Sequence, residues 1–199
     1  ELGFIWNLCI QQLKIKLPLL ILDEAHHLKN AHTKFASLFQ SSDDVAEISN
    51  GHLTNVFERM LFLTATPFQL GHYELCNVMN RFNAISWDIA VAPPKGKEHY
   101  DVYLSKLSTQ LDHSQKAALR LDEEWQKLTA NDLEINSVPY TDVSEWWSCI
   151  LTAKEDKLSL QTQKVLKQFI ITKSLMTEAE KLLRQMVIRH LRNRELPGN

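Results

Sequence analysis

The chain has 199 residues, of which 44% are hydrophobic and 23% charged, and its net charge is −2. These values are typical of a globular protein, and the small net charge excludes a protein that attracts nucleic acid through overall positive charge. No apolar run approaches the roughly 20 residues that span a bilayer, and no secretory signal is visible. Three distant cysteines predict neither a disulfide framework nor a zinc ribbon. We therefore expect an intracellular protein, cytoplasmic or, in a eukaryote, nuclear, without a membrane partner.

The first informative segment is a strand that ends in two carboxylates. A helical pattern over residues 4–16 ends near Pro18, and the apolar run 17–22 predicts a central parallel strand covered on both faces. Asp23 and Glu24 follow directly, at the end of the strand where open α/β sheets bind their ligands. In nucleotide hydrolases with such an acidic pair at the end of a strand of an open α/β sheet, the first carboxylate holds Mg²⁺ and the second polarises the attacking water.

A second apolar run, residues 60–63, predicts another strand that leads into Thr64-Ala65-Thr66-Pro67. Between the two strands, residues 41–58 are polar and contain a turn signal, which favours a surface excursion. After Pro67, periodicity predicts a helix over 71–82 that buries four apolar side chains: Leu75, Val78, Met79 and Phe82.

Beyond a break at residues 91–96, apolar positions recur in alternating steps of three and four, which indicates long helices packed lengthwise. The first register is Leu104, Leu107, Leu111, Ser114, Ala118, Leu121, Trp125 and Leu128. The second is Leu158, Thr162, Val165, Phe169, Thr172, Met176, Ala179, Leu183, Met186 and His190. Thr177 and Glu180 form a capping-box pattern that predicts a helix restart, and Thr141-Asp142 opens a short helix between the registers.

Two segments resemble motifs II and III of superfamily-two helicases. Residues 22–30, Leu-Asp-Glu-Ala-His-His-Leu-Lys-Asn, and residues 63–69, Leu-Thr-Ala-Thr-Pro-Phe-Gln, are most similar to the Swi/Snf-type DNA translocases. His27, Ala65 and Leu70 depart from the Arg, Gly and Asn that are usual there. The end of the chain, residues 189–197, loosely resembles the segment by which that family returns to its motor lobe.

The resemblance implies an α/β, helix-dominated fold: a partial RecA-like parallel sheet of few strands with a large antiparallel α-helical insertion. Residues 1–98 would form a partial RecA-like ATPase lobe, residues 99–188 a helical protrusion, and residues 189–199 the return segment. The protrusion is interpreted either as an arm that grips DNA or a partner, or as a bundle that only supports the lobe.

The resemblance also implies roles for individual residues. Asp23 would hold Mg²⁺ through water, Glu24 would activate the water that attacks ATP, and His26 would link the nucleotide to motif III. The coupling residues would be Thr64, Thr66 and Gln69. Three arginines near the end are candidates for nucleic-acid binding: Arg189, Arg192 and Arg194. The implied cofactors are ATP and Mg²⁺, and the implied partners are duplex DNA and the remaining segments of the motor lobe.

One essential part of such a motor is not found. A phosphate-binding loop needs Gly-x-x-x-x-Gly-Lys-Ser/Thr, and the only Gly-Lys pair, Gly96-Lys97, has neither the first glycine nor the hydroxyl. We therefore expect an interior part of a longer motor that hydrolyses no ATP alone. Two alternatives stay open: a non-catalytic helical protein-interaction module, and a subunit of a strand-separating helicase or restriction-type translocase.

Overall fold

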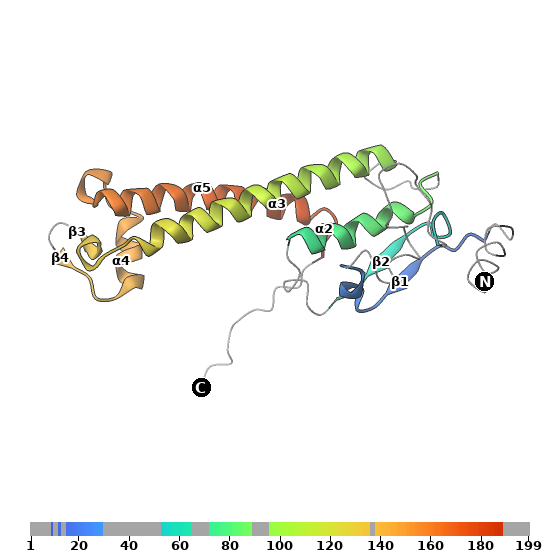
Figure 1. Cartoon of the computed structure of the whole chain (residues 1–199), viewed down its shortest axis with the longest axis horizontal. Helices are drawn as coiled ribbons and strands as arrows, with labels where there is room; N and C mark the ends of the chain where they lie inside the picture. Colours follow the sequence, from blue (N-terminus) through green and yellow to red (C-terminus); the bar gives the residue numbers. More distant parts are fainter. Residues whose placement is uncertain are drawn as a thin grey trace, which may run out of the picture. The chain divides into compact units, whose positions relative to one another are not determined.

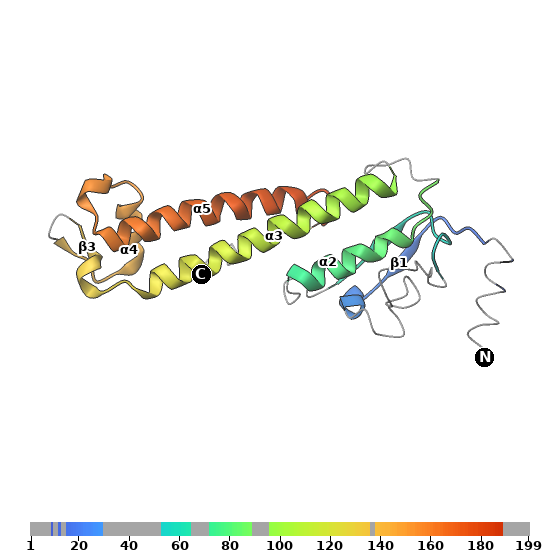
Figure 2. The ribbon, with the colours of Figure 1, turned by 45° about the horizontal axis from the view of Figure 1, so that its top comes forward.

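A computed structural model describes residues 9, 12, 15–29, 53–64, 72–88, 96–135 and 138–188 (Figures 1 and 2). The chain divides into two compact units, Glu1–Ser108 and Thr109–Asn199, and the division falls inside helix α3 (Lys97–Gln126). The predicted helix over 4–16 and the excursion over 41–58 lie mostly outside the described residues. Helix dominates the described chain, together with two small sheets. No helix within it is both long and apolar enough to cross a membrane.

The first unit is built on a parallel pair of strands. Strand β1 (Leu20–Leu22) lies beside β2 (Met60–Phe62), with Ile21 opposite Leu61. Both strands fall within the predicted apolar runs, so these predictions are confirmed. Parallel strands need a crossover connection, and the residues between 22 and 60 supply it. Helix α2 (His72–Asn80) lies over one face of the pair (Figures 1 and 2).

The core of this unit lies between the strands and α2. Leu28, which is fully buried in the 3₁₀ helix η1 (Ala25–Lys29), clusters with Val78 of α2 and Ala84. The inward side chains of both strands pack on this cluster: Leu20, Leu22, Met60 and Phe62. The predicted helix is confirmed with an earlier end, at Asn80, and Val78 and Met79 are buried as expected. Leu75 and Phe82 are only half-buried, and Phe82 lies in the 3₁₀ helix that follows.

The opposite face of the sheet corrects one expectation. Side chains alternate along a strand, so the intervening residues point away from α2, and they are exposed by 42–57%: Leu19, Ile21, Leu61 and Leu63. The prediction that β1 is covered on both faces is therefore wrong for this structure. Parallel sheets are normally covered on both faces, and this apolar surface is unusual.

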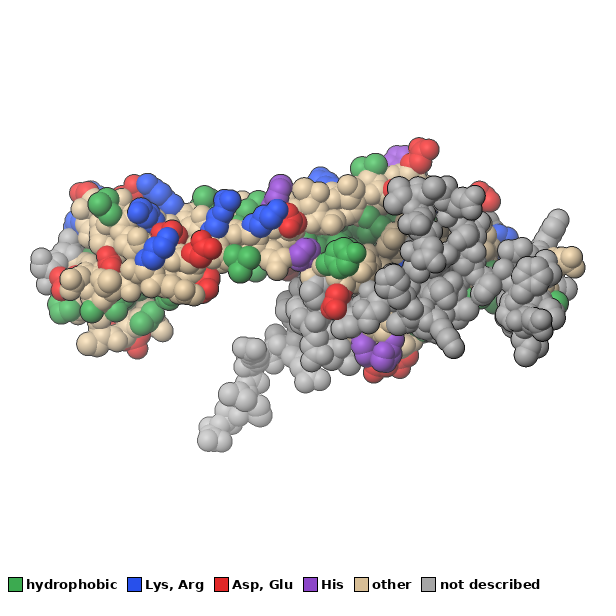
Figure 3. Space-filling view, in the orientation of Figure 1, with side chains coloured by type: hydrophobic (Ala, Val, Ile, Leu, Met, Phe, Trp, Pro, Cys, Tyr) green, Lys and Arg blue, Asp and Glu red, His purple; other side chains and the backbone are tan. Residues whose placement is uncertain are grey.

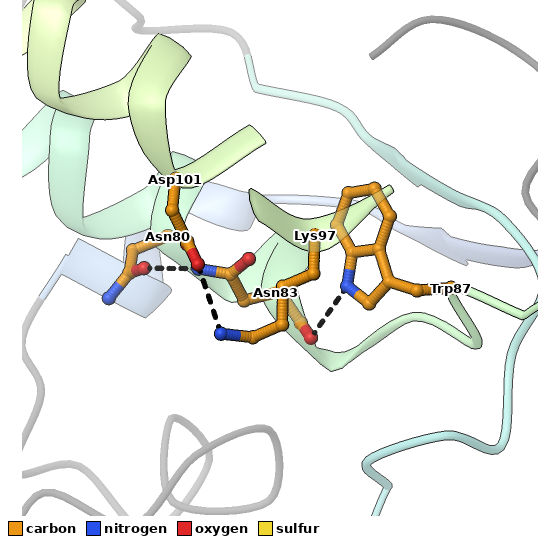
Figure 4. A network of polar contacts seen from close by, with 5 residues as sticks. All are labelled: Asn80, Asn83, Trp87, Lys97 and Asp101. Atoms are coloured by element: carbon orange, nitrogen blue, oxygen red, sulfur yellow. Dashed lines mark hydrogen bonds and ion pairs between the residues drawn. The ribbon is translucent and has the colours of Figure 1, made fainter. Parts of the chain in front are cut away.

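A polar network fixes the start of α3 to the end of α2 (Figure 4). Asn83, in the 3₁₀ helix η4 (Arg81–Ala84), donates its amide to Asn80 Oδ1 at 2.8 Å and to Asp101 Oδ1 at 2.9 Å. Lys97 donates to the second oxygen of Asp101, and the indole of Trp87 donates to the Asn83 carbonyl. Nearby, the buried Tyr100 hydroxyl donates to the Met79 carbonyl at 2.6 Å.

The second unit is a helical hairpin. Helix α5 (Leu160–Leu183) runs antiparallel to α3 (Figures 1 and 2). Three glutamines cross the interface, each donating to a backbone carbonyl of the other helix: Gln110 to Leu175, Gln168 to Ala117 and Gln161 to Glu124. The contacts step by seven residues on both helices, so they follow the heptad repeat. The predicted pair of long antiparallel helices is confirmed in outline, and α3 begins at Lys97, seven residues before the first position of the predicted register, Leu104.

Some predicted seam positions are wrong. Ala118 is exposed and Ala117 is buried instead, because the Ala117 carbonyl accepts from both Gln168 and Thr172. Met176 is 56% exposed. The predicted restart at Thr177 is also wrong: α5 is continuous there, and the Thr177 hydroxyl donates to the Lys173 carbonyl one turn earlier.

The hairpin is closed by α4 (Val143–Ile150), η5 (Ala130–Leu133), η6 (Glu155–Lys157) and a two-residue pair, β3 (Glu134–Ile135) with β4 (Val138–Pro139). The short helix was predicted, and Asp142 caps it by accepting from two backbone N–H groups. Trp146 and Ile150 are fully buried in the core of this region.

Asp132 joins the hairpin end to the start of α5. Its carboxylate accepts from the backbone and hydroxyl of Thr129, forming a capping box, and from the hydroxyl of Ser159. Ser159 in turn accepts from the backbone N–H of Thr162, so one carboxylate supports the N-cap of α5. These hydrogen bonds, that from Ser159 foremost, lower the pKa of Asp132.

We predict that the glutamine contacts hold the hairpin independently of one another. Replacing Gln110, Gln161 or Gln168 by Ala should lower the free energy of unfolding by about 0.5–1.5 kcal/mol each. Because the contacts lie about 10 Å apart along the helices, double variants should be additive within about 0.5 kcal/mol. Urea unfolding measures both. Gln126→Ala is the control, since the Gln126 amide donates within its own helix to Asp122. Unchanged stability in all three single variants would contradict the prediction that these glutamine contacts stabilise the hairpin.

We also predict an acid-sensitive hairpin end. Because the folded pKa of Asp132 is lowered, its stabilising contribution is present above about pH 4 and is lost as the pH falls through the folded value. Asp132→Asn should therefore flatten the dependence of the urea midpoint on pH below about pH 4. Asp142, whose pKa is lowered by its cap hydrogen bonds, should retain its own share of the slope. An unaltered slope in Asp132→Asn would refute the role of Asp132.

Candidate functional site

Leu63 fixes the geometry at the carboxyl end of the parallel strands. Its N–H donates to the Leu22 carbonyl at 2.8 Å, and its carbonyl accepts from the N–H of Ala25 at 2.8 Å. Asp23 and Glu24 are thus bracketed by two hydrogen bonds to one residue of the neighbouring strand segment. Both are exposed, and Thr64 follows Leu63 at the same edge of the sheet. The structure therefore brings the acidic pair and the first motif III hydroxyl to one edge.

The acidic pair adopts a tight backbone conformation. Glu24 has φ of 53°, in the left-handed region that disfavours residues with a Cβ. The Asp23 Oδ1 accepts from the Glu24 backbone N–H at 2.8 Å, which orients that carboxylate. A strained residue held by its surroundings is common at functional sites. Here the two hydrogen bonds of Leu63, to Leu22 and Ala25, hold Glu24 in this conformation.

His26 lies beside the second carboxylate. Its Nδ1 is 3.0 Å from Glu24 Oε2, and among the described residues this nitrogen makes no hydrogen bond. The His27 ring lies against the His26 ring, with centroids 4.1 Å apart. Buried Ala25 and Leu28 anchor η1 to the core, and thereby set where His26 stands.

The remaining predicted site residues are only partly described. Thr64 is half-buried at the strand end. The second motif III residues, Thr66 and Gln69, lie outside the described residues, and so do the arginines proposed for nucleic acid: Arg189, Arg192 and Arg194. Arg184, next to that group, pairs with Glu180 on its own helix.

The chemistry of the donors suits Mg²⁺. Mg²⁺ is usually held by one or two carboxylates and keeps several waters, and Asp23 offers an exposed, oriented carboxylate with Glu24 beside it. Within the described ranges, no group of three or more His, Cys, Asp or Glu side chains converges as a dedicated metal cage.

Sequence reasoning missed a buried cation in this unit. The Arg81 side chain, at the start of η4, is 5% exposed, and its Nε has no hydrogen-bond partner among the residues that the structure describes. Burial lowers the pKa of Arg81. An arginine next to an asparagine at a helix end gives no signal of burial, so no sequence pattern would have identified it.

Comparisons with known proteins found no match to this chain. No family model matches the chain, and no curated protein or solved structure matches it either. The geometry at Leu63 and the resemblance of the two motifs are thus the grounds for a functional proposal.

We predict that the left-handed backbone conformation at position 24 lowers the stability of the chain when the residue there has a Cβ. Glu24→Gly should be at least as stable as Glu24→Ala, because glycine adopts positive φ freely. At exposed Glu123, inside α3, the order should reverse, with Gly about 0.5–1 kcal/mol less stable than Ala. Thermal or urea unfolding of the four variants tests this. Should Ala be clearly preferred at position 24, the left-handed conformation would be refuted.

Proposed function

We propose that this chain is the part of an ATP-driven, Swi/Snf-like DNA translocase that carries the acidic and coupling motifs of a RecA-like first lobe. The observation that carries the proposal is the pair of hydrogen bonds through Leu63, which sets Asp23 and Glu24 at the carboxyl end of two adjacent parallel strands beside Thr64. Ligands of open α/β sheets bind at that end. Such a motor works in the cytoplasm or, in a eukaryote, the nucleus.

The residues take complementary roles in this proposal. Asp23 holds Mg²⁺ through water, and the ion supplies neutralising charge to the phosphates of ATP. Glu24, exposed and next to Asp23, orients and deprotonates the attacking water, an effect that is typically worth about 10²–10⁴ in rate. His26, whose Nδ1 lies 3.0 Å from the Glu24 carboxylate, links the nucleotide to motif III.

The coupling roles follow from the edge that the two strands share. Thr64, and with it Thr66 and Gln69, passes the state of the nucleotide to the rest of the motor. The resulting movement advances the protein along duplex DNA, which is held mainly through its phosphates. The phosphate-binding loop is supplied by other segments of the motor.

We predict that Glu24→Gln abolishes DNA-stimulated ATP hydrolysis in a polypeptide that unites this chain with a phosphate-binding loop. Turnover should fall by about 10²–10⁴, while equilibrium binding of ATP is retained because glutamine preserves the shape of the side chain. Glu123→Gln, on exposed α3 surface, is the matched control and should leave turnover unchanged. Normal hydrolysis in Glu24→Gln would end the proposal.

A second candidate function is a non-catalytic interaction module. The observation in its favour is that the helical hairpin forms a compact unit with a core of its own around Trp146. This function would be supported if the polypeptide containing the chain bound neither ATP nor DNA and yet captured a protein through the hairpin alone.

A further inference from the structure

The charges of the helical hairpin are segregated along its length. Residues 113–121 of α3 and 160–177 of α5 contain five Lys or Arg and no carboxylate. Acidic residues lie on either side of this stretch, at 122–124 and at 178–180. Although the whole chain has a net charge of −2, the middle of the hairpin is therefore cationic.

The register of the hairpin puts four of the five cations on one side. The contacts of Ala117 with Gln168, and of Glu124 with Gln161, place Arg120 level with Lys164. Four cations each precede a seam residue by one position, and in an antiparallel pair such positions lie on the same side of the seam. We call them the basic face: Lys116, Arg120, Lys164 and Lys167.

The basic face is exposed and only partly neutralised. Its four members are all exposed. Lys116 pairs with Asp112, and Lys164 lies near enough to Glu124 to help lower its pKa. Arg120 and Lys167 make no ion pair within the described part of the chain. Figure 3 shows Lys and Arg side chains along the hairpin, with Asp and Glu side chains among them.

We propose that the basic face binds the phosphate backbone of duplex DNA. DNA is a polyanion with regularly spaced phosphates, and each cation that contacts a phosphate releases counterions from DNA, which increases the affinity. Lysine is depleted from the cores of protein–protein interfaces, which makes an acidic protein the weaker candidate. The choice of DNA as the partner rests on the proposed function, whereas the basic face itself does not.

The test measures binding of a labelled duplex of mixed sequence to the full chain by fluorescence anisotropy, without nucleotide. The variant is Arg120→Gln/Lys164→Gln/Lys167→Gln. In about 50 mM salt it should bind at least about tenfold more weakly than the unaltered chain, and the slope of log K against log salt should shrink by about 2–3.

The matched control removes three exposed cations from elsewhere in the same unit: Lys154→Gln/Lys157→Gln/Lys181→Gln. It changes the net charge equally and should retain binding within about twofold, since these cations lie among carboxylates. Equal urea midpoints for both triple variants show that weaker binding does not come from unfolding.

Three outcomes would overturn the proposal. In the first, the unaltered chain fails to bind the duplex. In the second, the two triple variants weaken binding equally. In the third, poly-glutamate of matched charge competes with the labelled duplex for the chain as effectively as unlabelled DNA does. The last result would assign the face to an acidic polypeptide, for which exposed Ile170 and Ile171 would add apolar contacts. Because the assay contains no nucleotide, its result does not depend on ATP hydrolysis, and a failed ATPase test would leave the result standing.

Discussion

The candidate site depends on the way Leu63 bonds to both sides of the acidic pair. Its N–H and carbonyl engage Leu22 and Ala25, so the chain can leave β1 only through a two-residue loop directed out of the sheet edge. That constraint forces Glu24 into the left-handed region, and it keeps two carboxylates exposed although the residues before and after them are packed. The same bonds extend the parallel ladder beyond its last paired residues.

Much of the first unit could be predicted because buried parallel strands have an unmistakable composition. The two apolar runs locate both strands and their carboxyl ends, although β1 begins three residues later than the run that predicts it. The backbone conformation at Glu24 could not be predicted, because positive φ is usually signalled by glycine or asparagine and neither is present there. The exposed outer face was missed for a related reason: an apolar run predicts burial on both sides, whatever is available to cover it.

In the hairpin, periodicity predicted the helices but not the contacts between them. Side-chain amides of glutamine donate to backbone carbonyls of the opposite helix. A glutamine therefore lies at the interface opposite a small residue, as Gln168 does opposite Ala117. A heptad count that follows only apolar residues therefore selects Ala118 in its place. The capping box predicted at Thr177 does not form, because α5 is continuous there and the Thr177 hydroxyl bonds to the preceding turn. A capping box forms instead at Thr129, with Asp132.

The outer face of the β1–β2 sheet has a practical consequence. Four leucine and isoleucine side chains on this face are each between 42% and 57% exposed. Contiguous apolar surface of this kind promotes association in water. Purified by itself, the chain will tend to aggregate through this side as its concentration rises. Any covering polypeptide would suppress that tendency, so light scattering during co-expression trials offers a direct way to recognise its natural neighbour.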